Sequence, residues 1–310
     1  MKIHTTAILG AGAVGSYFLW GLSEKLGDNL WVIADGERRE RMESEGICIN
    51  GQIYHPNIRT PKEAYGADLI LTAVKYGGLS SAVDAIAEMT ADHTLVLSVL
   101  NGVDSEEIIG AKIGSEHVIP ALIKIASRRV GNEIRFDPAT TFGILYGEAE
   151  KDAASERTDA IAELFDGTPL HYRVCADILQ EIWYKFAFNV SMNLPQAILN
   201  CSIGAYVDSE HAAWLRIQLR DEVAAVAAAK GIDISELSEL EKLKHPSPPG
   251  ARYSTLQDLD AGRHTEIEMF AGTVVRMGRE LGVATPYNAF AYHAVKALEE
   301  KNDGKFNYDE

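Results

Sequence analysis

Short apolar runs rich in β-branched residues recur through the first 123 residues of the chain. They occupy 5–10, 30–34, 68–74, 94–100 and 117–123. Between several of them, as in 13–26 and 78–90, apolar residues recur at helical spacing. Strands that alternate with helices are typical of a doubly wound parallel sheet. The pieces 133–137 and 141–148 favour further strands added at an edge of that sheet.

From about residue 177 the strand signals stop. Three long helical patterns follow, at 177–193, 209–231 and 263–282, and a Pro/Gly-rich break at 244–255 separates the last two. The chain has 310 residues, and single cores rarely grow beyond about 250 residues. We therefore expect two domains, a sheet domain over 1–176 and an all-helical domain over 177–310.

One helical pattern carries an unusual polar stripe. The segment EIWYKFAFNVSMN (181–193) is apolar on most sides, but Glu181, Lys185, Asn189 and Asn193 follow one another at intervals of four residues. This spacing keeps them on one slowly drifting face of a helix. A solvated face would carry more charges, so the stripe favours the wall of a cavity. We expect Pro195 to end the helix.

The first strand is followed directly by the sequence GAGAVG. Its glycines are Gly10, Gly12 and Gly15, and Ala11, Ala13 and Val14 complete the loop. In a strand–turn–helix context this spacing gives a tight turn, room for a pyrophosphate and close helix packing. The pattern predicts a Rossmann fold that binds a dinucleotide.

The end of the second strand leaves the identity of the dinucleotide open. Asp35 follows the last glycine by 20 residues, where an acid accepts hydrogen bonds from the ribose of NAD. Arg38 and Arg39 follow at once, and either could pair with the 2′-phosphate of NADP. A solvated charge run at a helix start is the plainer interpretation.

Other polar residues stand where ligands bind such sheets. Lys75 and Asn101 follow the third and fourth strands, although each also suits a surface lysine or a turn. In the helical half, Ser254, Asp258 and Glu266 have spacings that suit helix faces. Ser254 could be only a helix cap, and Glu266 only a first-turn acid.

The charge and composition of the chain exclude some classes of binding partner. A net charge of −16 argues against nucleic acid and anionic membranes as partners. No apolar run is long enough to span a membrane, and the N-terminus lacks the pattern of a secretion leader. Cys48, Cys175 and Cys201 are far apart, so we expect reduced thiols, no metal site and a cytoplasmic protein.

Taken together, the motifs resemble those of the ketopantoate reductases (2-dehydropantoate 2-reductases) over nearly the whole chain. The resemblance rests on GAGAVG, VKYGGL, LNG, EIWYKFAFNVSMN, STLQDLDAGRHTEIEMFAG and GVATPYN. It implies a Rossmann domain followed by a helical domain, with the active site in the cleft between them. It also implies NADPH as cofactor, a 2-oxo acid as substrate and pantoate, on the route to coenzyme A, as product.

The resemblance also implies roles for individual residues. Lys185 matches the general acid, and Glu266 matches the residue that holds the substrate hydroxyl and supports that lysine. Asn189 and Asn193 match substrate-binding amides, and Ser254 matches the contact to the substrate carboxylate. Lys75, Asn101 and Glu266 are also implied to lie close to the cofactor.

Three departures from the family pattern keep alternatives open. Asp35 stands at or beside the place of a common arginine, Leu100 precedes Asn101, and Tyr253 precedes Ser254. NAD(H) in place of NADP(H), and a related 2-oxo acid, therefore stay open. So do another Rossmann-plus-helical dehydrogenase, such as a 3-hydroxy acid or opine enzyme, and a dinucleotide sensor without catalysis. The sequence does not fix the oligomeric state, and a homodimer is compatible with it.

Overall fold

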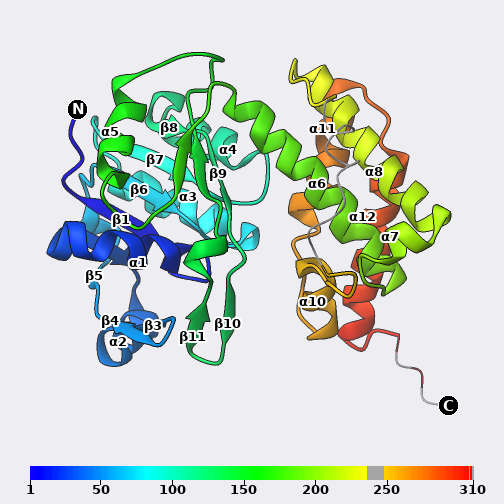
Figure 1. The fold of residues 1–310 in the computed structure, drawn as a ribbon, viewed down its shortest axis with the longest axis horizontal. Helices are drawn as coiled ribbons and strands as arrows, with labels where there is room; N and C mark the ends of the chain where they lie inside the picture. Colours follow the sequence, from blue (N-terminus) through cyan, green and yellow to red (C-terminus); the bar gives the residue numbers. More distant parts are fainter. Residues whose placement is uncertain (236–247, 307, 309–310) are drawn as a thin grey trace. The chain divides into compact units, whose positions relative to one another are not determined.

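The computed structural model describes residues 1–235, 248–306 and 308 (Figure 1). Part of the break expected at 244–255 therefore lies outside the described residues. The chain divides into two compact units, one from Met1 to Leu179 and one from Gln180 onward.

Unit 1 is built on a six-stranded sheet in which every neighbouring pair is parallel. The strand order is β5-β2-β1-β6-β7-β8, so the order reverses between β1 and β6. In such sheets ligands bind beyond the carboxyl ends of the strands at this reversal. The expected Rossmann fold is confirmed. The strands are β1 (Thr6–Leu9), β2 (Leu30–Ile33), β5 (Asn57–Arg59), β6 (Leu69–Thr72), β7 (Leu95–Ser98) and β8 (Val118–Ile119).

Helices cover both faces of this sheet, because alternate strand residues point to opposite sides. Ile8 packs into a core with α1 and α5, whereas Ala7 and Leu9 pack into a second core with α3 and α4. The helices are α1 (Gly15–Leu26), α2 (Gly36–Glu45), α3 (Leu79–Met89), α4 (Ser105–Ile113) and α5 (Glu156–Phe165). Short 3₁₀ turns are η1 (Gly27–Asn29), η2 (Lys62–Ala64), η3 (Tyr76–Gly78), η4 (Ser115–His117) and η5 (Pro138–Thr140).

The strand expected at 117–123 is two strands. Pro120 separates β8, at the edge of the main sheet, from β9 (Ala121–Lys124), which pairs with β12 (Gly143–Tyr146). Proline has no N–H for a strand ladder, so the chain leaves one sheet and enters another at this residue.

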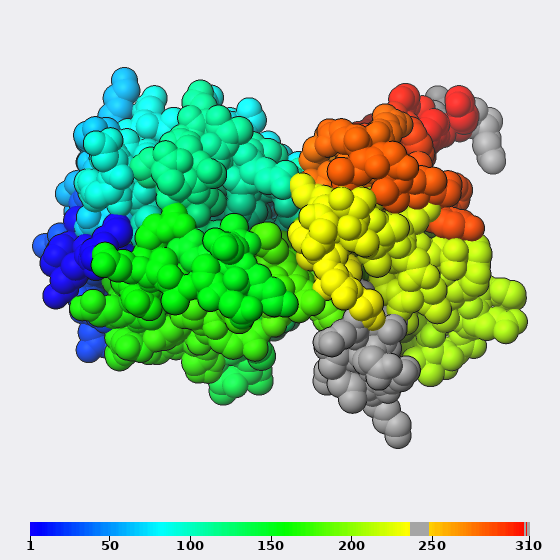
Figure 2. Space-filling view, turned by 90° about the horizontal axis from the view of Figure 1, so that it is seen from above, coloured from blue at the N-terminus to red at the C-terminus, as the bar shows by residue number. Residues whose placement is uncertain are grey.

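The strands expected at the edge of the main sheet lie in separate sheets. The piece 133–137 gives β11 (Glu133–Arg135) in a four-stranded sheet of order β10-β11-β3-β4, and the piece 141–148 gives β12 in a three-stranded sheet of order β13-β12-β9. Their other partners are strands of three residues, too short to be recognised in the sequence, namely β3 (Ile47–Ile49), β4 (Gln52–Tyr54), β10 (Arg128–Val130) and β13 (Tyr172–Val174). In the space-filling view the green segment after β8 covers a broad part of the unit's surface (Figure 2).

The described residues of unit 2 form helices joined by loops and turns, as expected. The helix α11 lies against α8, and Figure 2 shows these segments in orange and yellow. The helices are α6 (Ile178–Leu199), α7 (Ala205–Asp208), α8 (Glu210–Ala229), α10 (Ser254–Asp260), the π-helix η6 (Glu268–Gly272), α11 (Thr273–Leu281) and α12 (Pro286–Asn302).

Two expectations about these helices were wrong. Pro195 lies inside α6, which continues to Leu199. The backbone angle that proline imposes suits a helix, and Leu194 and Gln196 are fully buried on either side, so packing outweighs the missing N–H. The pattern at 263–282 becomes helical only at Glu268, and α12 was not foreseen as a helix.

Candidate active site

The glycine loop gives each glycine a different spatial role. Gly10 has φ +99°, and a Cβ there would lie 2.7 Å from the carbonyl oxygen of Ala73. A Cβ on Gly15 would lie 2.1 Å from the carbonyl oxygen of Gly10, so loop and helix need a glycine at their closest approach. A Cβ on Gly12 would meet nothing within 4 Å. The loop therefore leaves open space beside Gly12 at the start of α1, which fits a pyrophosphate.

The remaining loop residues differ in burial. Ala11 is buried, whereas Ala13 and Val14 are half-buried. Val14 is the last residue before α1 and makes no side-chain cap. The backbone at the start of α1 therefore carries the N–H groups that a phosphate would bind.

Asp35 and the arginines that follow it differ in their surroundings. Asp35 is exposed and precedes α2, and its carboxylate does not cap that helix. Arg39 forms ion pairs of 2.8 Å with both Glu43 and Glu63. Arg38 instead lies among other arginines: desolvation and the charges of Arg41 and Arg129 lower its pKa, while Asp35 acts in the opposite direction.

Lys75 and Asn101 are exposed residues that follow β6 and β7. The loops that carry them are joined by a hydrogen bond of 2.8 Å from the hydroxyl of Tyr76 to Oδ2 of Asp104. Asp104 is 1% exposed, so this contact is shielded from water. The side chains next to Lys75 and Asn101 thus hold the two loops together.

A half-buried acid, Glu106, lies in the first turn of α4, shortly after Asn101. The Ser105 hydroxyl donates to Oε2 of Glu106 at 2.7 Å and lies 2.8 Å from the hydroxyl of Ser98. Burial of the Glu106 carboxyl raises its pKa to about 7; hydrogen bonds from Ser105 and the backbone oppose the shift, and Asp104 adds to it. Glu106 therefore titrates near neutral pH.

The polar stripe of α6 lies at the boundary between core and solvent. Glu181, Lys185 and Asn189 are half-buried, and Asn193 is 5% exposed. The neighbouring Trp183 and Phe186 are buried and pack edge to face at 6.0 Å. The surrounding core thus fixes the face that carries Lys185.

Hydrogen bonds from the C-terminal part of α6 attach it to the segment 251–254, which leads into α10. Asn193 donates from Nδ2 to the carbonyl of Asn189 at 2.9 Å, and its Oδ1 accepts from the hydroxyl of Ser254 at 3.2 Å. Gln196 adds to this attachment, because its Oε1 accepts from the N–H of Tyr253 at 2.6 Å and its Nε2 donates to the carbonyl of Ala251 at 3.1 Å. Two predicted site residues, Asn193 and Ser254, are therefore in direct contact.

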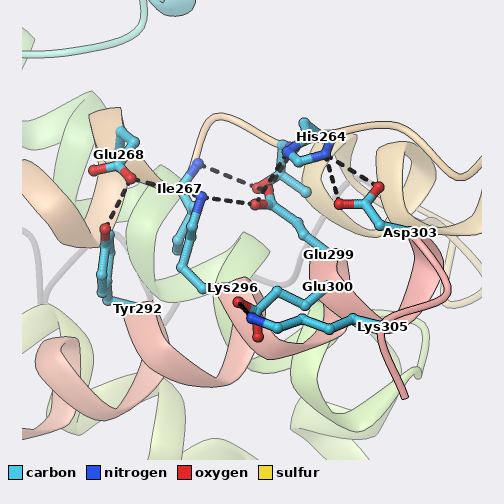
Figure 3. A network of polar contacts seen from close by, with 10 residues as sticks. His264, Ile267, Glu268, Tyr292, Lys296, Glu299, Glu300, Asp303 and Lys305 are labelled. Atoms are coloured by element: carbon cyan, nitrogen blue, oxygen red, sulfur yellow. Dashed lines mark hydrogen bonds and ion pairs between the residues drawn. The ribbon is translucent and has the colours of Figure 1, made fainter. Parts of the chain in front are cut away.

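Glu266 is half-buried and lies between two anchored residues. On one side, Glu299 of α12 binds Thr265 through Oε1, and its Oε2 lies 3.0 Å from Nζ of Lys296 and 3.5 Å from Nδ1 of His264 (Figure 3). Burial raises the pKa of Glu299, but the hydrogen bonds of Thr265 and the charge of Lys296 outweigh it, and the pKa is lowered.

On the other side of Glu266, the ring of Phe270 in η6 lies 6.3 Å from the ring of Phe186 in α6. Phe186 is the residue after Lys185. The helix α6, which carries Lys185, and the π-helix η6, which begins two residues after Glu266, therefore pack together within unit 2.

The predicted residues thus fall into two sets. The loop 10–15, Asp35, Arg38, Lys75 and Asn101 belong to unit 1, whereas Lys185, Asn189, Asn193, Ser254 and Glu266 belong to unit 2. Sequence reasoning missed the residues that hold these sets in place, which are Tyr76, Asp104, Gln196, Thr265 and Glu299. Gln196 carried a usable signal, because it lies one helical turn beyond Asn193.

Among the described residues, no group of three or more histidine, cysteine, aspartate or glutamate residues could hold a metal ion. Within the same residues, no helix is long and apolar enough to cross a membrane.

The parallel sheet with its glycine loop, followed by a helical unit, is typical of oxidoreductases that bind a nicotinamide dinucleotide. Two family models match the chain: "Ketopantoate reductase PanE/ApbA" over residues 6–147 and "Ketopantoate reductase PanE/ApbA C terminal" over residues 177–299. The chain belongs to the ketopantoate reductase family.

Relatives that match along the full chain agree with this assignment. A 2-dehydropantoate 2-reductase of Pyrococcus horikoshii is 28% identical, and the match covers 98% of this chain and 99% of the relative. One of Archaeoglobus fulgidus is 26% identical over 96% of this chain and 99% of the relative.

Solved structures with the same fold include a PanE/ApbA family ketopantoate reductase from Ralstonia eutropha, with a TM-score of 0.80, 25% identity and coverage of 96% and 99% of the two chains. A D-mandelate dehydrogenase solved with NADH and anilino(oxo)acetate has a TM-score of 0.82 and 24% identity over 96% of this chain and 99% of that one.

Proposed function

We propose that this protein reduces 2-dehydropantoate to pantoate with a reduced nicotinamide dinucleotide, on the route to coenzyme A. The observation that carries the proposal is a half-buried lysine, Lys185, held by core aromatic residues on α6 of a ketopantoate reductase family member. Relatives that match along the whole chain and are named for this reaction support the same assignment.

A bound reduced nicotinamide supplies a hydride to the ketone carbon of the 2-oxo acid. Negative charge then develops on the ketone oxygen, and the ammonium group of Lys185 stabilises this charge and donates a proton to it. General acid catalysis of this kind typically contributes a factor of about 10²–10⁴ to the rate. In this assignment Glu266 holds the substrate hydroxyl and supports the ammonium form of Lys185, because a carboxylate close to an ammonium group favours its charged form.

The remaining residues of the α6 stripe bind and orient the substrate. Asn189 supplies an amide, and Ser254 contacts the substrate carboxylate. Asn193 belongs to the same site, because its side chain accepts the hydroxyl of Ser254 at 3.2 Å and so orients it. Lys75 and Asn101 lie close to the nicotinamide and substrate in this assignment.

In unit 1 the loop from Gly10 to Gly15 holds the pyrophosphate, and the open space at Gly12 supports this role. Asp35 is exposed at the end of β2, where it can accept hydrogen bonds from the adenosine ribose. NADP(H) is the proposed coenzyme, because several guanidinium groups, including that of Arg38, lie close to this strand end. NAD(H) is the alternative, because Asp35 repels a 2′-phosphate.

A related 2-oxo acid is the second candidate substrate. The D-mandelate dehydrogenase that shares this fold was solved with anilino(oxo)acetate, which is not ketopantoate. Tyr253, next to Ser254, would line the carboxylate pocket and alter its shape.

We also propose that the protein forms a homodimer. Trp214 and Tyr287 are exposed aromatic residues whose rings meet edge to face at 5.5 Å, and the exposed Phe290 follows one turn along α12. Exposed aromatic clusters of this kind are typical of interfaces. Light scattering should give twice the chain mass of 33.9 kDa, and a mass of one chain would refute the dimer.

The proposed function is tested by following the loss of the reduced-nicotinamide absorbance band with ketopantoate, in parallel with NADPH and with NADH. We expect rapid ketopantoate-dependent oxidation and a preference for NADPH. A panel of other 2-oxo acids and 3-hydroxy acids, run with both coenzymes, is the control for substrate. Binding of coenzyme without turnover of any of them would contradict the proposal and favour a sensor.

A further inference from the structure

A hollow of about 70 Å³ lies beside the glycine loop in unit 1. Three segments that are far apart in the sequence form it. Ala11 comes from the glycine loop, Arg41 and Glu45 come from α2 and its end, and Arg129 and Asn132 come from the β10–β11 hairpin. Its remaining walls are Met42, Gly46 and Ile47. The hollow is therefore next to the loop that would hold the pyrophosphate.

The register of the hairpin explains why Arg129 reaches this hollow. Arg129 lies opposite Ile134 of β11, and residues opposite each other in an antiparallel pair point to the same face. Ile134 is fully buried in the core that also contains Met42 and Ile47. Arg129 therefore points towards α2. Arg128, the preceding residue, points to the opposite face, where Arg135 forms an ion pair with Glu133.

Positive charge is in excess around the hollow. Arg41 and Arg129 line it, and their charges help lower the pKa of the neighbouring Arg38. Glu45 is the one acidic residue that lines the hollow, and the carboxylate of Asp35 acts on Arg38. Among the described residues no ion pair joins Arg38, Arg41 or Arg129 to a carboxylate within 4.0 Å, so these guanidinium groups are not committed to another acid and can pair with a bound anion.

Arg39 has a different role from its neighbours. Its guanidinium bonds to Glu43 at one nitrogen and Glu63 at another, and these hydrogen bonds raise its pKa. Arg39 therefore fastens α2 to the segment after β5 and is committed to carboxylates.

We infer that Arg41 and Arg129, together with Arg38, bind a phosphomonoester attached to the ribose of the dinucleotide. The inference rests on the proposed function, because it takes the glycine loop as the pyrophosphate site. It assigns coenzyme choice to two elements, α2 and the β10–β11 hairpin, of which the hairpin lies outside the usual strand–turn–helix motif. Asp35 holds the unmodified ribose, and the arginines select the coenzyme that carries a 2′-phosphate.

Equilibrium binding tests this inference without turnover. The dissociation constants of NADPH and NADH, which differ only by the 2′-phosphate, are measured by coenzyme fluorescence for the wild type and for Arg41→Ala, Arg129→Ala and the double variant. Arg128→Ala is the matched control, because it removes the same charge from the same strand on the opposite face. Thermal unfolding of each variant verifies that it is folded.

We expect each single variant to weaken NADPH binding by about tenfold or more, as for loss of a charge-assisted hydrogen bond, and to leave NADH binding unchanged. Arg128→Ala should change neither constant. Equal losses for both coenzymes would overturn the inference and indicate a pyrophosphate contact. An unchanged ratio of the two constants in the double variant would overturn it as well. If the inference fails while ketopantoate is still reduced, the proposed function stands.

Discussion

The carboxylate of Glu299 holds Thr265 by two hydrogen bonds to a single oxygen. The backbone N–H and the hydroxyl of Thr265 each donate to Oε1 of Glu299 at 2.7 Å. Glu299 is 3% exposed, and Thr265 directly precedes Glu266. A buried acid on α12 therefore fixes the backbone that presents Glu266.

Removal of the contact between Glu299 and Thr265 should weaken the binding of the substrate. In Glu299→Ala the Thr265 donors lose their acceptor, so Glu266 loses its fixed position. We expect the KM for ketopantoate to rise about tenfold, with unchanged NADPH affinity. Steady-state kinetics and a coenzyme titration measure the two quantities. Glu299→Gln keeps an acceptor oxygen and should restore most of the loss.

The control for this prediction is Glu300→Ala on the same helix. Glu300 pairs with Lys305 at the surface (Figure 3), and among the described residues no hydrogen bond joins it to Thr265. The Glu300→Ala variant should leave the KM for ketopantoate unchanged. Wild-type kinetics in a folded Glu299→Ala variant would show that the contact does not position Glu266.

The acid behind Asn101 gives a pH prediction. Glu106 has a folded pKa of about 7, above the ordinary value of 4.5, so folding favours its protonated form. The carboxyl of Glu106 therefore contributes most to the free energy of unfolding below pH 4.5. This contribution falls as the pH rises towards 7 and does not change further above that pH. Glu106→Gln mimics the protonated acid. We expect it to raise the Tm by a few degrees at pH 8, with no gain near pH 4.

The comparison is made by thermal unfolding of both proteins from pH 4 to 8. Glu107→Gln, an exposed neighbour with the same charge change, is the control. A variant that is less stable than the wild type at pH 8 would show that the charged form of Glu106 is favoured by its surroundings.

Two substitutions in the glycine loop should distinguish an effect on coenzyme binding from an effect on stability. A Cβ at position 12 has no neighbour within 4 Å, so Gly12→Ala should fold with a near-normal Tm but lose coenzyme affinity. A Cβ at position 15 would lie 2.1 Å from a carbonyl oxygen, so Gly15→Ala should lose about 1–3 kcal/mol of stability. Thermal unfolding and coenzyme titration are measured for both. Gly12→Ala with wild-type affinity would place the pyrophosphate elsewhere.

The sequence predicted the fold where local pattern determines it. The apolar runs at β1, β2, β6 and β7 are fully buried strands, and their alternation with helices defines a parallel sheet. The short strands β3 and β10 were missed because they are held by pairing with distant segments rather than by their own sequence. Pro195 misled the helix prediction, because packing on both sides outweighs one missing hydrogen bond.

The candidate site was predictable only in part. Motifs indicated Gly12, Lys185 and Glu266, since their residue types carry chemistry at recognisable spacing. The residues that hold them, such as Glu299 and Gln196, are distant in sequence or resemble ordinary surface residues in the sequence. Their importance depends on burial and on hydrogen-bond partners, which the fold alone determines.

The central claim is that the ammonium group of Lys185 donates the proton to the substrate oxygen. The most direct measurement is the kcat of Lys185→Ala for ketopantoate, together with its NADPH dissociation constant. The account predicts a loss of about 10²–10⁴ in kcat with coenzyme affinity unchanged. A folded variant with near-normal kcat would contradict it.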